Sequence, residues 1–380
     1  MTRPTPPGGR RPRSRSRRSP RACFSASRLI EWSASNSSSA PRTDGRGSPR
    51  RRRAQGFRTM NRLATRFSLL LVAALAAHSV SLADGPAVPE GSALVFTSFR
   101  GNGDDGLHLA ASRDGYTWTA LNGDRPIFQP KVGGGLVRDP NIVQGPDGLF
   151  HMVWTTGWTH SAIGYAHSKD LIHWSEARQI VVMQDEPRSR NVWAPELFYD
   201  DKNDRFLIFW ASTIPGRFPE TETTGDDGYN HRTYMTATKD FETFTPTKLF
   251  YEPGFNSIDA TIVRDGDRYA MFIKDETLKP PAKNLRVAFA DAPSGPFGPP
   301  SPPITGDFWA EGASAIKLGD RWFLYFDRYV DHRYGLVTST DLVHWNDESD
   351  RVRFPADFRH GSVLLVPSTI RDGLEALGRE

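Results

Sequence analysis

The sequence predicts an all-β fold, a five-bladed β-propeller with four antiparallel strands per blade. A short phrase recurs along the chain, consisting of Ser or Thr, any residue, Asp and a nearby aromatic residue. Each copy follows alternating apolar runs that are rich in aromatic and β-branched residues and are bounded by Gly, Asp and Pro, which is typical of strands. Because four short strands per repeat form a propeller blade, this repeat predicts the architecture.

The recurring phrase marks the turn between the third strand and the outer strand of each repeat. A β-rich run precedes every copy, so strand, turn and outer strand are expected in that order. The clear copies lie at 112–118, 168–174, 238–244 and 339–345, and a degenerate copy lies at 290–297.

Two further strands are expected before each phrase. The second strands are predicted at 150–155, 206–210, 269–273 and 322–326. The inner strands begin with polar residues and are predicted at 138–143, 194–198, 258–263, 311–316 and 360–365.

The fifth blade is predicted to combine strands from both ends of the chain. Its inner strand is at 360–366, and the other three are expected at 94–98, 107–111 and 118–121. Closing the ring in this way removes exposed sheet edges. A tandem array of two β-sandwiches is the alternative. A helical period is visible only in the tail at 370–380.

The first 59 residues are expected to lie outside the propeller. Residues 1–58 contain 16 Arg and two acidic residues, and the Ser, Pro and Gly that fill most of the remainder cannot bury enough apolar surface to fold. Residues 1–59 are therefore predicted to be a disordered leader or the result of a misplaced start codon. An arm that binds RNA or a membrane is the alternative.

Residues 60–83 are predicted to be a secretory signal peptide. A short positive region at 61–66, an apolar core at 67–77 and the small-residue site at 81–83 follow the usual order. The apolar core is too short to span a membrane. Cleavage near Ala83 would leave residues 84–380 as a single domain that is secreted or periplasmic.

Charge and cysteine content narrow the classes of function. The whole chain has a net charge of +4, but its first 83 residues carry +16, which leaves −12 on the predicted domain. The basic pI is therefore no evidence of nucleic-acid binding. The only cysteine, Cys23, lies in the leader, which excludes disulfides and thiol chemistry from the predicted domain.

Polar residues near the start of the inner strands recur at intervals of 49–63 residues, and they are Asp139, Glu196, Asp259, Glu311 and His360. Inner strands line the central channel, so we expect these side chains around one pocket. A carboxylate cluster suits cleavage of glycosidic bonds, because one acid must donate a proton while another stays ionised. Crowding of like charges raises one pKa above the others and so separates the two roles.

Aromatic and basic residues near these acids fit sugar recognition. Trp193 and Trp309 precede channel acids and could pack against the C–H faces of a sugar ring, or they could belong to the core between blades. Arg333 could pair with a channel carboxylate or a sugar hydroxyl, or form a surface salt bridge. His360 could orient a bound water or a cation. We predict no metal site and no cofactor, and we leave open a structural channel cation such as calcium.

The segments that carry these residues resemble those of glycoside hydrolase family 43. The matching segments are Arg138-Asp139-Pro140, Trp193-Ala-Pro-Glu196, Ser257-Ile-Asp259-Ala, Trp309-Ala-Glu311-Gly and Arg359-His360-Gly361. The family consists of five-bladed propellers and includes arabinanases, α-L-arabinofuranosidases, β-xylosidases and some β-galactofuranosidases. The similarity spans about residues 92–367. One departure is Ala313, where members often carry Pro.

The resemblance implies an inverting mechanism. Asp139 would be the general base, Glu311 the general acid, and Asp259 the third carboxylate that tunes and orients the acid. Water would attack in a single displacement, without a covalent sugar intermediate. The substrate would be an arabinofuranosyl, xylosyl or galactofuranosyl residue of an oligo- or polysaccharide. The expected substrate-binding residues are Trp193, Glu196, Trp309, Arg333 and His360.

Two other functions stay open at this point. A retaining β-fructosidase-like propeller also carries Arg-Asp-Pro, but its Trp-x-Asn-Asp-Pro-Asn-Gly-like and Glu-Cys phrases do not occur in this sequence. A non-catalytic carbohydrate-binding propeller would keep the pocket without turnover. The insert at 214–232 is expected to overhang the pocket and favour exo action. We expect a monomer, with no nucleic-acid partner and no membrane span.

Overall fold

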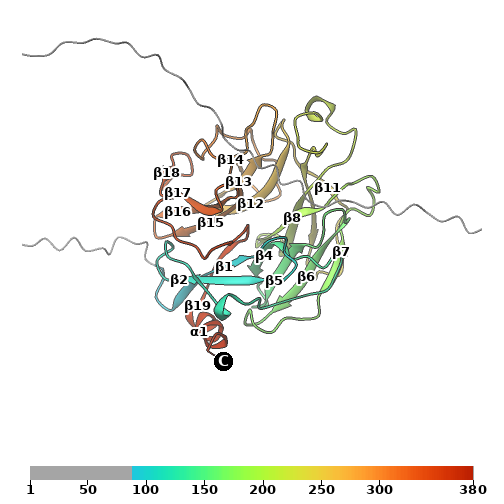
Figure 1. The fold of residues 1–380 in the computed structure, drawn as a ribbon. Coiled ribbons are helices and arrows are strands. Elements are labelled where there is room, and N and C mark those ends of the chain that lie inside the picture. The colour runs from blue at the N-terminus through green and yellow to red at the C-terminus, as the bar shows by residue number, and fades with distance from the viewer. Residues whose placement is uncertain (1–87, 380) are drawn as a thin grey trace, which may run out of the picture. The chain divides into compact units, whose positions relative to one another are not determined.

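The computed structural model describes residues 88–379, whose strands form five sheets arranged around a central channel (Figure 1). The prediction of a five-bladed propeller is confirmed. The predicted leader, the signal peptide with its cleavage site, and Cys23 lie outside the described residues. Among the described residues, no helix is long and apolar enough to cross a membrane.

The sheet that closes the ring joins the two ends of the described chain. Strand β19, Val363–Pro367, pairs antiparallel with β1, Ser92–Ser98, and so becomes the innermost strand. The sheet continues outward through β2, His108–Ser112, and β3, Thr119–Ala120. The prediction of a blade shared between both chain ends is therefore confirmed.

Three of the other sheets have four strands each, in the order in which the chain forms them. The first contains β4 (Arg138–Gln144), β5 (Phe150–Thr155), β6 (Ala162–Ser168) and β7 (Arg178–Val181). The second contains β8 (Trp193–Asp200), β9 (Arg205–Ser212), β10 (Arg232–Thr238) and β11 (Lys248–Tyr251). The third contains β15 (Glu311–Leu318), β16 (Arg321–Arg328), β17 (Arg333–Ser339) and β18 (Asn346–Asp347).

One blade differs from the prediction because its sheet has three strands. These are β12 (Ser257–Asp265), β13 (Arg268–Asp275) and β14 (Asn284–Ala290). A segment still runs beside β14, where the backbone N–H groups of Gly298, Ser301 and Ile304 donate to β14 carbonyls. The intervening residues 299, 300, 302 and 303 are prolines, which have no N–H, so a regular outer strand does not form.

The recurring Ser/Thr-x-Asp phrase forms a hydrogen-bonded turn after the third strand. In the copy that follows β6, a carboxylate oxygen of Asp170 accepts hydrogen bonds from the backbone N–H groups of Ile172, at 2.9 Å, and His173, at 2.8 Å. The hydroxyl of Ser168 accepts the N–H of Leu171 at 2.9 Å. Short polar side chains commonly stabilise turns in this way.

Large aromatic side chains fill the space between blades. Trp154 of β5 is fully buried and lies opposite Gly164 of β6, where a Cβ atom would be 2.0 Å from the indole ring. Phe326 of β16 lies opposite Gly335 of β17 in the same manner, with 2.1 Å left for a Cβ. Glycine at these positions therefore makes room for the core.

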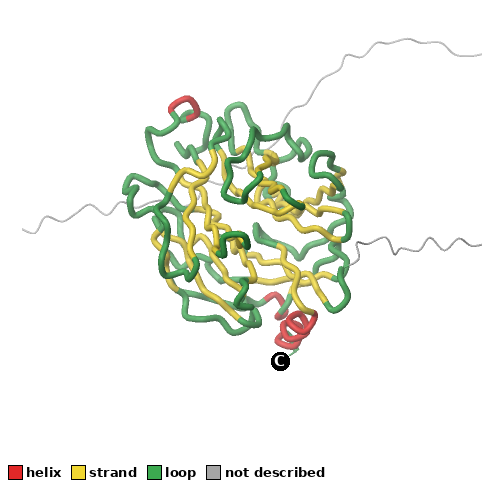
Figure 2. Tube along the Cα trace, turned by 180° about the vertical axis from the view of Figure 1, so that it is seen from behind, coloured by secondary structure: helices red, strands yellow, loops and turns green. Residues whose placement is uncertain are grey.

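Among residues 88–379, helical structure is confined to short segments at the periphery of the ring (Figure 2). The short 3₁₀ turns are η1, Asn122–Asp124, and η2, Pro219–Thr221. Helix α1, Ser368–Leu377, follows β19 and lies in the predicted helical tail. It buries Leu374 in the core cluster that also contains residues of β1 and β5.

Candidate active site

Equivalent four-residue segments lie at or directly before the starts of the five inner strands, at 138–141, 193–196, 258–261, 311–314 and 359–362. In the first four segments the pairing with the second strand skips from the first residue to the fourth, which is a β-bulge. The second residue of each bulge has a positive φ, and these residues are Asp139, Ala194, Asp259 and Gly312. The bulges turn both the first and the second side chain toward the end of the channel at which the inner strands begin, which we call the mouth.

The polar residues predicted near the starts of the inner strands do not occupy equivalent positions in this register. Asp139, Asp259 and His360 are the second residues of their segments, whereas Glu311 is a first residue. Glu196 is a fourth residue, two positions further along its strand. The other fourth residues are Asn141, Thr261, Ser314 and Ser362, and all of them are buried.

A cavity of about 150 Å³ lies at the mouth. Its lining residues come from the starts of the inner strands and from the loops and strand ends that face them. They are Arg138, Asp139, Thr155, Trp158, Trp193, Ala194, His231, Ile258, Asp259, Lys274, Glu276, Glu311 and His360. Sites for drug-sized ligands span roughly 300–1,000 Å³, so a cavity of this size suits one small ring.

Asp139 is held as an ionised carboxylate. One of its oxygens accepts a hydrogen bond from the hydroxyl of Thr155 at 2.8 Å, and the other lies 3.3 Å from Nδ1 of His360. Burial alone would raise the pKa of Asp139, but His360, together with Arg138 and Thr155, lowers this pKa well below its ordinary value. A buried carboxylate that stays charged can accept a proton from water.

His360 is held as a cation between two acids. Its Nδ1 also lies 3.9 Å from a carboxylate oxygen of Asp259. Burial opposes the charge, yet Asp259 and Asp139 raise the pKa of His360 to about 10. The cationic ring therefore keeps both carboxylates in place.

Asp259 and Glu311 have pKa values shifted in opposite directions. Burial raises the pKa of Asp259, whose carboxylate accepts the backbone N–H of Gly312 at 3.1 Å. Burial would also raise the pKa of Glu311, but the carboxylate of Glu311 lies 3.0 Å from Nζ of Lys274 and 3.2 Å from a guanidinium nitrogen of Arg359. These cations and His360 lower the pKa of Glu311.

Asp327 and Thr155 are among the site residues that were not predicted from the sequence, whereas Lys274 was expected near the mouth. Asp327 pairs in register with Glu311 and accepts a hydrogen bond at 2.7 Å from Nε of Arg359. Lys274 and Thr155 likewise lie opposite the first residues Ile258 and Arg138. The signal that could have found them is positional, because each stands near the end of a second strand, directly across from a mouth residue.

The predicted tryptophans lie at the mouth but differ in their surroundings. Trp193 lines the cavity, and its Nε1 donates to the carbonyl of Trp158 at 3.0 Å. The Trp158 side chain is 46% exposed and also lines the cavity. Trp309 is 36% exposed and packs against Tyr329 instead. Trp309 and Glu196 are not among the residues that line the cavity.

The structure places Arg333 away from the acids. Its side chain is half exposed and lies 3.6 Å from Asp350, which makes it the surface ion pair that was the alternative interpretation. It lines a separate hollow with Phe354 and Phe358. Among the described residues, no group of three or more His, Cys, Asp or Glu is arranged to hold a metal ion.

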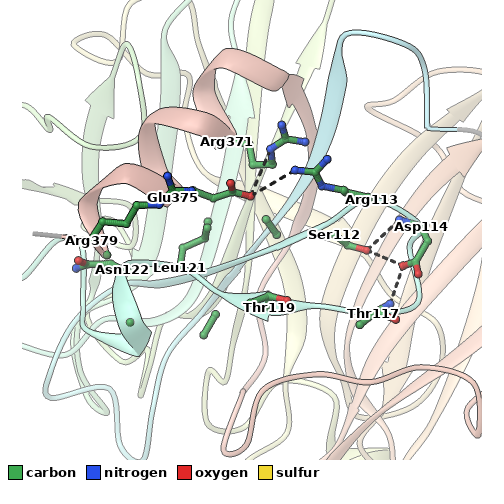
Figure 3. A pocket seen from close by; sticks show the side chains of 14 residues that line it. Ser112, Arg113, Asp114, Thr117, Thr119, Leu121, Asn122, Arg371, Glu375 and Arg379 are labelled. Carbon is green, nitrogen blue, oxygen red and sulfur yellow. Dashed lines mark hydrogen bonds and ion pairs between the residues drawn. The ribbon is translucent and has the colours of Figure 1, made fainter.

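A larger hollow, of about 570 Å³, lies between β2, β3 and α1 (Figure 3). The end of β2 that borders it, at Ala111 and Ser112, is the end farthest from the mouth, since His108 at the other end of β2 pairs with Ser98. The acids there are already engaged, Glu375 with Arg371 and Arg113, and Asp114 with backbone N–H groups of its turn. The catalytic candidates are therefore those at the mouth.

The fold and the site define a class, that of five-bladed propellers with buried carboxylates around a small cavity at one end of the channel. Residues 90–372 match a family of domains related to glycoside hydrolase family 43, described as "Probable glycosyl hydrolase domain". The chain belongs to this family.

Individual relatives are distant. An α-L-arabinofuranosidase of Bifidobacterium longum subsp. longum is 22% identical over 198 residues, which cover 46% of this chain and 18% of the relative. Among solved structures, an α-L-arabinofuranosidase of Lactobacillus brevis is 19% identical with a TM-score of 0.43, covering 56% of this chain and 72% of the other. An exo-β-1,3-galactanase of Clostridium thermocellum is 13% identical with a TM-score of 0.43, covering 55% and 47%.

Proposed function

We propose that the protein is an inverting glycoside hydrolase that removes arabinofuranosyl, xylosyl or galactofuranosyl residues from oligo- or polysaccharides. The observation that carries this proposal is the pairing of an ionised carboxylate, Asp139, with two further carboxylates, Asp259 and Glu311, in one small cavity. Inverting hydrolysis needs one carboxylate as a base for water and one carboxylic acid as a proton donor.

Asp139 is the general base in this proposal. Its lowered pKa keeps it ready to accept a proton from a water molecule that attacks the anomeric carbon. Within the bulge Asp139 has a φ of 51°, a left-handed conformation that Asp tolerates better than most residues. The strained backbone is therefore consistent with a residue held in place for chemistry.

Glu311 is the general acid and Asp259 its partner. The two carboxylates belong to adjacent segments, and the N–H of Gly312, directly after Glu311, is bound by Asp259. In addition to burial, the charge of Glu311 raises the pKa of Asp259, so the titration of these two buried carboxylates belongs to the pair and not to either group. A proton that resides on the pair can be passed to the leaving oxygen by Glu311.

The proposal includes exo action. The cavity has room for one small ring, and the insert at 214–232 contacts its rim, since Tyr229 packs against Trp193 with ring centroids 4.6 Å apart. Backbone N–H groups of Leu278 and Lys279 also donate to the carbonyl of Thr224 within this insert. A covered mouth admits the end of a chain more readily than its middle.

A non-catalytic carbohydrate-binding propeller is the second candidate. One observation favours it, namely that Lys274 and Arg359 hold Glu311 ionised, which is the wrong state for a proton donor. Binding alone would not require a protonated acid.

The deciding experiment compares residues 84–380 with the variants Asp139→Ala and Glu311→Ala. Hydrolysis of p-nitrophenyl arabinofuranoside, xyloside and galactofuranoside is measured together with oligosaccharide binding by calorimetry. The hydrolase proposal predicts activity on at least one substrate and a loss of at least a hundredfold in kcat for each variant. Equal trace activity in all three proteins with intact binding would instead support the binding function.

A further inference from the structure

Each cation that contacts Glu311 has a second carboxylate of its own. Lys274 contacts Glu311 at 3.0 Å and Glu276 at 2.6 Å. Arg359 contacts Glu311 at 3.2 Å and Asp327 at 2.7 Å. Glu311 therefore lies between two cation–carboxylate pairs that come from different blades.

This arrangement matters because Lys274 is shielded from water. Its side chain is 3% exposed, whereas that of Arg359 is 24% exposed. If Glu311 were the only partner of Lys274, protonating it would leave a buried ammonium group without a counter-charge, which costs several kcal/mol. With Glu276 present, Lys274 keeps a partner in both protonation states of Glu311.

Glu276 is itself shared. Lys283, whose side chain is buried, forms an ion pair with the other oxygen of Glu276. Burial opposes the charge on Glu276, but Lys274 and Lys283 lower its pKa to about 2, so it stays ionised over the working range of a glycosidase. Glu276 is thus shared between Lys283 and Lys274, and Lys274 is shared in turn between Glu276 and Glu311.

We infer that Glu276 and Lys283 are positioning residues that set how strongly Lys274 holds the carboxylate of Glu311 in its ionised form. Glu276 draws the ammonium group of Lys274 away from Glu311 and favours the protonated acid. Lys283 neutralises part of the charge of Glu276 and favours the ionised one. This inference deepens the proposed hydrolase function, and it rests on Glu311 being the proton donor.

The groups that act on Glu311 come from every element around it. Asp259, Asp327, Tyr329 and Tyr334 contribute negative or neutral oxygen atoms, and His360 contributes a cation in addition to Lys274 and Arg359. The charges that act on Glu276 are those of Lys274 and Lys283. Glu276 also acts on His231, but burial lowers the pKa of His231 to about 3, which leaves this ring neutral. Changing Glu276 or Lys283 leaves all the direct contacts of Glu311 in place.

The test uses Glu276→Gln and Lys283→Met in residues 84–380. In the pH profile of kcat/KM, the alkaline limb reports the loss of the proton from the acid. Glu276→Gln should move this limb to lower pH, because Lys274 then has Glu311 as its remaining carboxylate. Lys283→Met should move it to higher pH. Each shift should be about 0.5 pH unit or more.

Three control variants test whether the shifts come from the charges at positions 276 and 283 and not from any change of charge in the protein. Glu276→Asp and Lys283→Arg keep the charges and should return the limb toward that of the parent protein. Asp201→Asn removes a negative charge from an exposed pair with Arg264, in the turn after β8 at the end of that strand opposite the mouth, and should leave the limb unchanged. Shifts of equal sign in Glu276→Gln and Lys283→Met, or no shift in either, would overturn the inference.

A second readout does not depend on turnover. The carboxyl ¹³C resonance of Glu311, assigned by its disappearance in Glu311→Gln, is titrated by NMR in each variant. Opposite displacements of its midpoint in a protein that hydrolyses no glycoside would show that Glu276 and Lys283 control the charge of Glu311, but they would overturn the proposed function and, with it, the role of this control in catalysis. A midpoint that stays fixed in an active enzyme would overturn the inference alone.

Discussion

Nδ1 of His360 lies 3.3 Å from a carboxylate oxygen of Asp139 and 3.9 Å from one of Asp259. The imidazole also fills the space beside Gly312, where an added Cβ would be 2.5 Å from the ring. The cationic ring of His360 is thus fixed between Asp139, the proposed base, and Asp259, the partner of the proposed acid. The pH dependence of activity should therefore depend on this ring.

Replacing His360 by Gln should shift the acidic limb of the activity profile to higher pH. The cation lowers the pKa of Asp139, so its loss raises that pKa, and the base then becomes protonated at a higher pH. We expect a shift of about 1 pH unit, measured as kcat/KM from pH 3 to 8. The control is His344→Gln, which removes an exposed histidine that pairs with Asp341 in an outer turn. An acidic limb that does not move would contradict the assigned role of His360.

Glu196 should make the protein less stable as the pH rises. Burial raises its pKa from an ordinary value of 4.5 to about 8, so folding favours the protonated form. Its contribution to stability is full below about pH 4.5 and is lost progressively up to about pH 8. His360, with a pKa raised to about 10, acts in the same direction from about pH 6.5 upward.

Glu196→Gln should therefore flatten the pH dependence of stability. The free energy of unfolding, measured with urea at pH 5, 6, 7 and 8, should fall for the parent protein by up to about 1.4 kcal/mol per pH unit from this residue. The variant should lose that part of the slope and gain relative stability at pH 8. Parallel curves for the two proteins would show that Glu196 is charged in the fold.

Adding a methyl group at Gly164 or Gly335 should destabilise the propeller. Each glycine faces an aromatic ring at a distance that no Cβ can occupy, so the ring must move. Overpacking of this kind costs about 1–3 kcal/mol, which thermal unfolding would detect. The matched control is Gly373→Ala in α1, where the nearest atom is 3.5 Å away and the better helix former should add up to about 1 kcal/mol.

Trp158→Ala should weaken substrate binding without slowing the chemical step. The indole is exposed at the mouth, where it packs against Arg138 and Trp193, and we expect it to contact the sugar that leaves. We expect KM to rise about three- to tenfold with kcat nearly unchanged, since aromatic contacts contribute about 1 kcal/mol. A proportional fall in kcat would mean that Trp158 supports the catalytic groups instead. Val343→Ala, at an exposed outer-turn site, is the control.

The architecture could be predicted because the repeat is local. Each Ser/Thr-x-Asp phrase forms its turn with its own backbone, so the pattern appears in a single sequence and locates the neighbouring strands. The three-stranded blade of β12, β13 and β14 was not predicted, although its run of prolines is visible in the sequence. The missing N–H donors have an effect only where the segment lies beside β14.

The site could be predicted only in part, for a geometric reason. Asp139, Asp259 and Glu311 were found because they open inner strands. The bulges, however, place first and second residues at the same mouth and separate Glu196 from them, which counting residues does not show. Lys274, Glu276 and Asp327 belong to no repeated phrase, since each meets Glu311 or its cations across a sheet or between blades.

The configuration of the first product tests the central claim most directly. Residues 84–380 are mixed with the aryl glycoside that they cleave, and proton NMR follows the anomeric signals before mutarotation equilibrates them. With Asp139 as the base for water, the sugar should first appear with the anomeric configuration opposite to that of the substrate. A first product with the configuration of the substrate would contradict this role, because retention requires a carboxylate to attack the anomeric carbon in place of water.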